Sequence, residues 1–145
     1  MPATKPHADA TFTFSVPADW VDRSMVVYSA PAGTAPVPPN VVVAYDRLQD
    51  GEALGAYVTR QLAQLMRAAQ GFELASRRDL TFAGRPAVEL RFSWAAGPGR
   101  MAQRQIFTVL GDGRVASVAN TAAADDFAAA DETFTAVLDS LRWSA

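Results

Sequence analysis

The chain has no cysteine among its 145 residues. That absence excludes disulfide bonds, thiol nucleophiles, cysteine-bound zinc and acylation of a lipoprotein cysteine. The only histidine, His7, lies close to the N-terminus and has no histidine or cysteine partner. A serine hydrolase triad would therefore lack a well-placed base. We expect no metal site, no cofactor and no enzymatic activity.

The chain also lacks an excess of positive charge and any long apolar run. It carries 13 Lys and Arg against 15 Asp and Glu, so it has no basic patch of the kind that binds phosphate backbones. No segment approaches the ~20 apolar residues of a membrane span, and the N-terminus has no signal-peptide core. We expect a cytoplasmic protein that binds no nucleic acid and does not insert into a membrane.

The apolar content is high enough for one substantial core, because half of the residues are hydrophobic. A chain of this length should bury roughly 68–70% of the surface that its unfolded form exposes. Residues 1–9 contain two prolines and show no periodicity, which is typical of a flexible tail. We therefore expect a tail at 1–9 and a single domain at 10–145.

Short alternating segments predict a sheet of about six to eight strands. Short glycine-containing connections between several of them favour an antiparallel meander. The predicted strands lie at about 12–16, 24–29, 40–48, 72–82, 87–94, 101–110 and 114–121.

Two segments predict helices. The first follows Asp50-Gly51 and ends at Gly71, and its apolar residues recur every three or four positions. The second begins at Asp125-Asp126, where acidic residues suit a helix N-terminus. The first stripe is Leu54, Val58, Leu62, Leu65 and Ala69, and the second is Phe127, Phe134, Val137 or Leu138, and Leu141. The fold class is α+β, with a mostly antiparallel sheet.

Several strands are apolar on both faces. In 40–48, Val41 and Val43 point to one face of the sheet while Val42 points to the other. We expect two helices to cover one face but scarcely both. The second face would then be covered by loops and edge strands, by a second copy of the chain, or by a ligand.

The strand at 101–110 is patterned unusually, because Gln103 and Gln105 stand between Met101 and Phe107 on one face. The register of this strand against 88–94 is open. A slip of one residue would move both glutamines to the other face.

Five segments, taken in their order and spacing, carry a resemblance to a known family. They are "FSVPADWVDRSMVVY", "NVVVAYDRLQDGEALGAYVTRQLAQLMRAAQGFEL", "LTFAGRPAVELRFSW", "MAQRQIFTV" and "FAAADETFTAVLDSLRW". Together they resemble the DcrB-like family with a PsbP-like fold. The similarity covers about residues 10–143 and is greatest to the Eag chaperones of type VI secretion.

This resemblance implies a function that composition alone does not. Eag chaperones are cytoplasmic homodimers that hold the N-terminal transmembrane segments of a secreted effector, often an Rhs toxin with a PAAR domain, before it is loaded for export. It also implies a client-binding surface in which aliphatic side chains pack on the client and amides hydrogen-bond to it. The matching positions are Met25, Val27, Asn40, Val42, Gln61, Leu65, Met101, Gln103 and Gln105. The alternative is a non-catalytic interaction or assembly factor of the same fold that binds a soluble partner.

Overall fold

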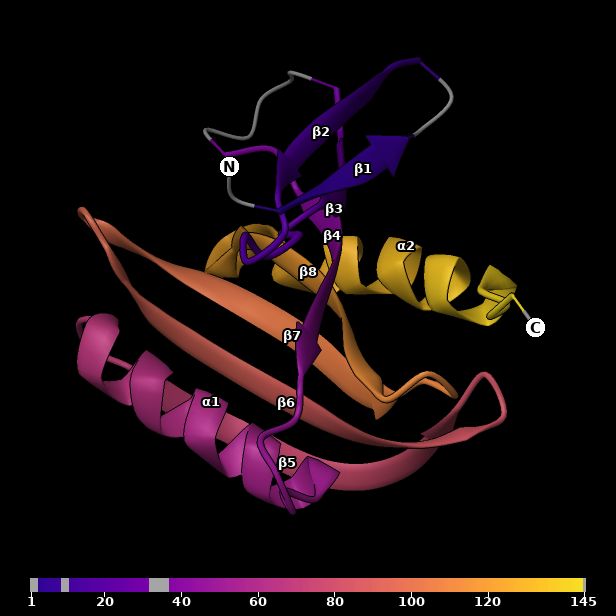
Figure 1. Cartoon of the computed structure of the whole chain (residues 1–145). Helices are drawn as coiled ribbons and strands as arrows, with labels where there is room; N and C mark the ends of the chain where they lie inside the picture. The colour runs from indigo at the N-terminus through magenta and orange to yellow at the C-terminus, as the bar shows by residue number, and fades with distance from the viewer. Residues whose placement is uncertain (1–2, 9–10, 32–36, 145) are drawn as a thin grey trace.

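The computed structural model describes residues 3–8, 11–31 and 37–144. Within these ranges, six antiparallel strands form one curved sheet in the order β3-β4-β8-β7-β6-β5, and β1 and β2 form a separate hairpin (Figure 1). The strands are β1 (Thr4–Ala8), β2 (Thr13–Pro17), β3 (Met25–Ser29), β4 (Asn40–Arg47), β5 (Glu73–Phe82), β6 (Arg85–Ala96), β7 (Gly99–Val109) and β8 (Arg114–Ala123). The helices are α1 (Leu54–Ala68) and α2 (Phe127–Ser140), the latter preceded by the 3₁₀ turn η1 (Ala124–Asp126). The predicted α+β class with a mostly antiparallel sheet is confirmed.

The expected tail at 1–9 is different in the structure, because Thr4–Ala8 form strand β1. This strand pairs with β2, with Lys5 opposite Val16 and His7 opposite Phe14. Pro6 is tolerated because β1 is an edge strand, where a missing backbone N–H need not break a ladder. The sequence lacked a signal here because proline and the short length both count against a strand.

The β5–β6 connection is a tight turn that sets the register of this hairpin. Ala83 and Gly84 both have positive φ, at 49° and 82°, which is the geometry of the tight turns that suit the twist of two antiparallel strands. In the next hairpin, Val88 pairs with Phe107. The open register is thus resolved, and Gln103 and Gln105 lie on the same face as Val88.

Helix α1 begins later and ends earlier than its sequence signals suggest. It starts at Leu54 rather than next to Gly51, because Gly51 has a φ of 73° that a right-handed helix does not accept. Its first helical turns are held by Glu52, whose carboxylate accepts hydrogen bonds from Arg60 at 3.0 and 2.9 Å. It ends at Ala68, before Gly71, which lies in the following turn.

Helix α1 packs on one face of the sheet. Its buried side chains Tyr57 and Val58 meet the residues of β6, β7 and β8 that point to that face. The aromatic rings of Tyr57 and Phe107 contact each other edge to face, with centroids 5.9 Å apart. The strand members of this core are Val88, Leu90, Phe92, Phe107 and Val115.

Helix α2 packs on the opposite face, against the alternate residues of the same strands (Figure 1). Phe134 and Leu138 are its buried anchors, so Leu138 rather than Val137 continues the predicted stripe. The strand members of this second core include Phe82, Ala87, Ile106 and Val118. The two helices were expected to cover one face of the sheet, but each covers part of a different face. Alternation shows that a strand has two apolar faces, but it does not show which helix packs on which face.

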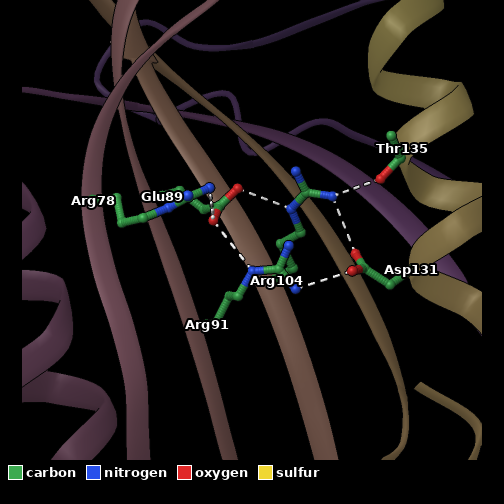
Figure 2. A network of polar contacts seen from close by, with 6 residues as sticks. All are labelled: Arg78, Glu89, Arg91, Arg104, Asp131 and Thr135. Atoms are coloured by element: carbon green, nitrogen blue, oxygen red, sulfur yellow. Dashed lines mark hydrogen bonds and ion pairs between the residues drawn. The ribbon is translucent and has the colours of Figure 1, made fainter. Parts of the chain in front are cut away.

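A network of charged side chains also lies on the α2 side (Figure 2). Its centre is Glu89 on β6, whose side chain is fully buried. One carboxylate oxygen accepts hydrogen bonds from Arg78 at 3.1 Å and Arg91 at 3.2 Å, and the other accepts one from Arg104 at 2.9 Å. Glu89 thereby ties together β5, β6 and β7.

The same arginines reach across to α2. Arg91 and Arg104 donate to the two carboxylate oxygens of Asp131 at 3.0 and 3.1 Å, and Arg104 also donates to the hydroxyl of Thr135 at 3.0 Å. The guanidinium of Arg104 lies 5.5 Å from the ring of Phe134. The network therefore holds α2 against the sheet in addition to joining the three strands.

The protonation of Glu89 reflects two opposing effects. Desolvation by burial raises the pKa of its carboxyl group, but the hydrogen bonds and charges of Arg104 and Arg91 outweigh it, so that the pKa lies below its usual value. Glu89 is consequently ionised at neutral pH despite its full burial.

Candidate functional site

On the α1 side of the sheet, the half that carries β3 and β4 is left open. Helix α1 is held over the other half by Arg77 of β5, which donates to the hydroxyl of Thr59 at 2.8 Å and to the carbonyl of Gly55 at 2.9 Å. We call the uncovered part the open strip. It consists of the α1-side residues of β3, β4 and β8: Met25, Val27, Ser29, Asn40, Val42, Ala44, Ser117, Ala119 and Thr121.

The apolar side chains of the open strip are exposed at its outer margin and more buried towards β8. Met25 and Val27 on β3 are 57% and 52% exposed, although both are hydrophobic. The centre of the strip is made of small residues: Ala44 and Ser117 are half-buried, and Ala119 is buried. A surface with large apolar side chains at one margin and small ones along its floor can accept a bulky apolar partner.

The strand register aligns these residues in rows across the sheet. One apolar row contains Val27, Val42 and Ala119 and ends at Gln105 on β7. The neighbouring row is polar and contains Ser29, Asn40, Thr121 and Gln103. The two glutamines therefore lie where the open strip meets the half of the sheet that α1 covers.

The polar side chains along this border are linked to one another. The Thr121 hydroxyl donates to Oε1 of Gln103 at 3.0 Å, and Nε2 of Gln103 donates to Oε1 of Gln105 at 2.8 Å. Within the described residues, the amide nitrogen of Gln105 has no hydrogen-bond partner. The chain of amides thus ends in a half-buried donor.

A second polar group of the row is also incompletely paired. Oδ1 of Asn40 is buried and accepts no hydrogen bond from any described residue. A buried acceptor without a partner costs free energy, typically about 1–3 kcal/mol. Nδ2 of Asn120 and Nε1 of Trp143, on the other side of the sheet, are unpaired as well, so the Asn40 oxygen is an acceptor available in this row rather than a feature found only here.

Helix α1 presents one side to the open strip. The Tyr57 hydroxyl donates to Oδ2 of Asp46, at the end of β4, at 2.8 Å. Burial, and then this hydrogen bond, raise the pKa of the Tyr57 phenol, so it stays protonated and keeps its role as donor. Gln61 and Leu65 follow at steps of four residues and share this side of the helix.

All nine positions predicted from the sequence lie on the α1 side. Those on β3 and β4 belong to the open strip, and those on β7 and α1 lie along its border. Leu65 differs from the others because it packs against the α1 core. Met101 lies at one end of the border, opposite Ala123.

Sequence reasoning missed the residues of β8. Ser117, Ala119 and Thr121 form the floor of the open strip, yet they belong to a strand whose pattern of small residues resembled a plain core strand. The signal available was the run "ASVANTAA", in which small side chains occupy both faces and leave room above the sheet.

A different hollow, of about 790 Å³, lies between the N-terminal hairpin and the ends of β4 and β8. Its lining is strongly charged and contains Lys5, Asp22, Asp46, Arg47 and Arg114 among others. Arg114 is already engaged there, since it donates to Asp112 at 2.7 Å and lies over the Tyr45 ring. This hollow suits a charged partner, whereas the open strip suits an apolar one.

In residues 3–8, 11–31 and 37–144, the His, Asp and Glu side chains form no group of three or more that could hold a metal ion. Neither α1 nor α2 is long and apolar enough to cross a membrane.

Comparison with curated proteins gives one significant relative, named effector EagT6, from Pseudomonas aeruginosa. It is 29% identical over 92 residues, which are 63% of this chain and 64% of that protein. The alignment thus spans slightly less than two thirds of the length of the relative.

Among solved structures, similar folds are found in three proteins of very different sequence. A protein of unknown function, PA94, from Pseudomonas aeruginosa matches 98% of each chain with a TM-score of 0.80 at 22% identity. LpqN, involved in cell envelope biogenesis of Mycobacterium tuberculosis, has a TM-score of 0.59 at 15% identity and covers 94% of this chain and 88% of its own. Cyanobacterial PsbP from Synechocystis has a TM-score of 0.54 at 12% identity, covering 97% and 92%.

The family assignment rests on a match that extends over most of the chain. The model of the family described as DcrB matches residues 12–140, a span that runs from the start of β2 to the end of α2. Together with the PsbP-like arrangement of sheet and helices, this match shows that the chain belongs to the DcrB family.

Proposed function

We propose that this protein is a chaperone of type VI secretion that binds the N-terminal transmembrane segments of a PAAR or Rhs effector and shields them before loading and export. The observation that carries the proposal is the open strip, where Met25 and Val27 expose apolar surface beside a line of linked amides.

The shape of the open strip suits an apolar helix. A helix with its side chains is about 10–12 Å across, so it needs a broad floor rather than a narrow pocket. Small residues such as Ala44 and Ala119 let such a helix approach the sheet closely, as small residues do between membrane helices. The exposed Met25 and Val27 would cover one flank of the helix and α1 the other.

The amides suit the polar groups that a membrane helix still carries. A transmembrane helix often contains Ser or Thr hydroxyls, or carbonyls freed at Gly or Pro, and these groups need partners once the helix leaves the lipid. The free amide nitrogen of Gln105 is a donor for such a group, and Oδ1 of Asn40 is an acceptor in the same polar region. Client binding would thus complete hydrogen bonds that the free protein leaves unmade.

Sequence similarity to a curated protein also supports the proposal. The relative EagT6 links this chain to the Eag proteins by sequence, in agreement with the resemblance found along residues 10–143. On the same basis we propose that the chaperone is a cytoplasmic homodimer without enzymatic activity.

The test is co-expression with the N-terminal fragment of the effector encoded beside this protein. We expect the fragment to be soluble and to co-purify with the chaperone, and to aggregate without it. Gln105→Ala should weaken binding about tenfold, since each amide contact to a buried helix contributes roughly 1–2 kcal/mol. The matched control is Gln64→Ala, an exposed glutamine on α1. A fragment that is equally soluble without the protein would contradict the proposal.

A second candidate is an assembly factor of the same fold that binds a soluble partner. The charged hollow lined by Arg47 and Arg114 is the observation in its favour. The gene neighbourhood separates the two: an adjacent reading frame with two apolar segments ahead of a PAAR or Rhs region favours the chaperone, and its absence favours the assembly factor.

A further inference from the structure

A groove of about 610 Å³ lies on the α2 side of the sheet, where the ends of β7 and α2 approach β3 and β4. Four apolar side chains from these segments line it: Val26, Val43, Leu110 and Leu141. Val43 packs against the second core, and Val26 is its cross-strand partner. The groove is therefore on the face opposite to the open strip. Its volume is within the range of about 300–1,000 Å³ that is typical of ligand sites.

Positive charge gathers around this apolar lining. Arg85, Arg114 and Arg142 border the groove, and Asp112 is the one acidic residue of the described chain that does so. We call this site the arginine groove. Its charge contrasts with that of the whole chain, in which Asp and Glu outnumber Lys and Arg by 15 to 13. A local excess of positive charge beside apolar surface favours a ligand that is anionic and partly apolar.

Two of the three arginines have no carboxylate partner within residues 3–8, 11–31 and 37–144. Nη1 of Arg85 donates to the carbonyl of Val109 at 3.4 Å, and Nη1 of Arg142 donates to the carbonyls of Asp139 and Leu141 at 3.0 and 2.8 Å. In the same residues, Nη2 of each guanidinium has no hydrogen-bond partner. A guanidinium has five donors in a planar fork that matches a carboxylate, so both arginines keep donors for a ligand.

The third arginine is paired, but with a residue that a ligand can displace. Arg114 donates to the carboxylate of Asp112 at 2.7 Å, and its guanidinium lies 4.6 Å from the centre of the Tyr45 ring. The side chain of Asp112 is 53% exposed. An exposed ion pair contributes little free energy, so an incoming carboxylate can share or replace this contact.

We propose that the arginine groove binds an acidic segment of a partner protein, in which carboxylates flank one apolar or aromatic side chain. The carboxylates would pair with Arg85, Arg114 and Arg142, and the apolar side chain would cover Val26, which is 51% exposed. Arginine clusters are a recurring means of recognising acidic motifs. The proposal adds a second binding site, on the opposite face of the sheet, and does not depend on what the open strip binds.

The size and composition of the arginine groove favour a peptide over two other anionic partners. A nucleic acid gains its affinity from many phosphates along an extended basic surface, whereas this site offers three arginines beside apolar side chains. Anionic membranes are recognised by clusters of about four to eight basic residues. An acidic peptide uses both the charged border and the apolar lining.

The test measures fluorescence anisotropy of a labelled heptapeptide made of Asp and Glu around a central Phe. We expect saturable binding to the natural chain below about 1 mM. A control peptide with Asn and Gln in place of Asp and Glu should bind at least about tenfold more weakly, and so should an acidic peptide with Ala in place of Phe. Equal binding of the Asn and Gln peptide, or no saturable binding of the acidic one, would overturn the proposal.

Substitutions locate the binding on the protein. Arg85→Gln and Arg142→Gln should each weaken binding of the acidic peptide about threefold, because each loses one partly exposed charge pair. The matched control is Arg67→Gln, an exposed arginine in the last turn of α1, which should bind like the natural chain. Equal weakening by Arg67→Gln would overturn the proposal, because it would show a general effect of charge.

One variant should improve binding, which damage to the fold would not do. Asp112→Asn removes the carboxylate that competes for Arg114, so we expect the acidic peptide to bind about threefold more tightly. Weaker binding by Asp112→Asn would contradict the role of Arg114. Binding of phosphatidylserine vesicles or of a short RNA, with no binding of the acidic peptide, would also overturn the proposal. Gln105→Ala, on the other face, should leave peptide binding unchanged, so this inference and the proposed function can fail separately.

Discussion

The two faces of the sheet differ in the charge of their linked polar groups. On the α2 side, Glu89 is fully buried and receives hydrogen bonds from three arginines, two of which also bind Asp131. On the α1 side, the polar row at the border of the open strip is uncharged, and the amide nitrogen of Gln105 and Oδ1 of Asn40 lack partners within the described residues. The α2 side also has unpaired buried groups, because Nδ2 of Asn120 and Nε1 of Trp143 have no partner among the same residues.

The charged network makes the α2 side a permanent contact with its own helix, whereas the uncharged amides of the α1 side can change hydrogen-bond partners. Removing a charged member of a buried network is strongly destabilising. The contact between α2 and the sheet is therefore costly to break. Neutral amides are much less costly to uncover and to pair again. A surface that must capture and later release a helix would therefore carry amides rather than charges.

The largest effect on stability should come from removing the charge of Glu89, at the centre of the network on the α2 side. Glu89→Gln leaves the three arginines without their shared carboxylate, and we expect the free energy of unfolding to fall by about 3–5 kcal/mol. Urea denaturation would measure the loss. Glu132→Gln, on an exposed position of α2, is the control and should change stability by less than about 0.5 kcal/mol. Similar stabilities for both variants would show that the network does not hold this face.

Acid should act on the same network. The pKa of Glu89 is lowered in the folded protein, so its contribution is complete above the pKa of about 4.3 for an unfolded chain and is lost as pH falls through the folded value. The natural chain should therefore lose stability below about pH 4. Because Glu89→Gln cannot lose that contribution, the difference in stability between the two should shrink in acid. A difference that stayed constant from pH 7 to pH 3 would contradict this assignment.

The sequence predicted the parts of the fold that depend on local periodicity. The stripe of α1, the alternation of β6 and β7 and the short turns between strands all depend on neighbouring residues, and each was found. The same period of two places Met101, Gln103 and Gln105 on one face once the register is known. The register of β7 against β6 depends on the turn between Ala96 and Gly99, where Gly97 has a φ of 62°, and alternation alone does not specify it.

The parts that depend on distant contacts were not predicted. The Glu89 network joins residues up to 40 positions apart, and no local pattern marks them as partners. The placement of α1 and α2 on opposite faces likewise depends on how the strands connect in space. The floor of the open strip was missed because Ala119 and Ser117 act there through their small size rather than through their chemistry.

The most direct test of the different roles of the two faces is the reactivity of single cysteines in the presence of the effector fragment. Ala44→Cys places a thiol on the open strip, and Thr135→Cys places one on α2, on the other side of the sheet. We expect the fragment to slow maleimide labelling at position 44 by at least about tenfold and to leave labelling at position 135 unchanged. Unchanged labelling at position 44, or slower labelling at position 135 alone, would contradict the proposal that the client binds to the open strip.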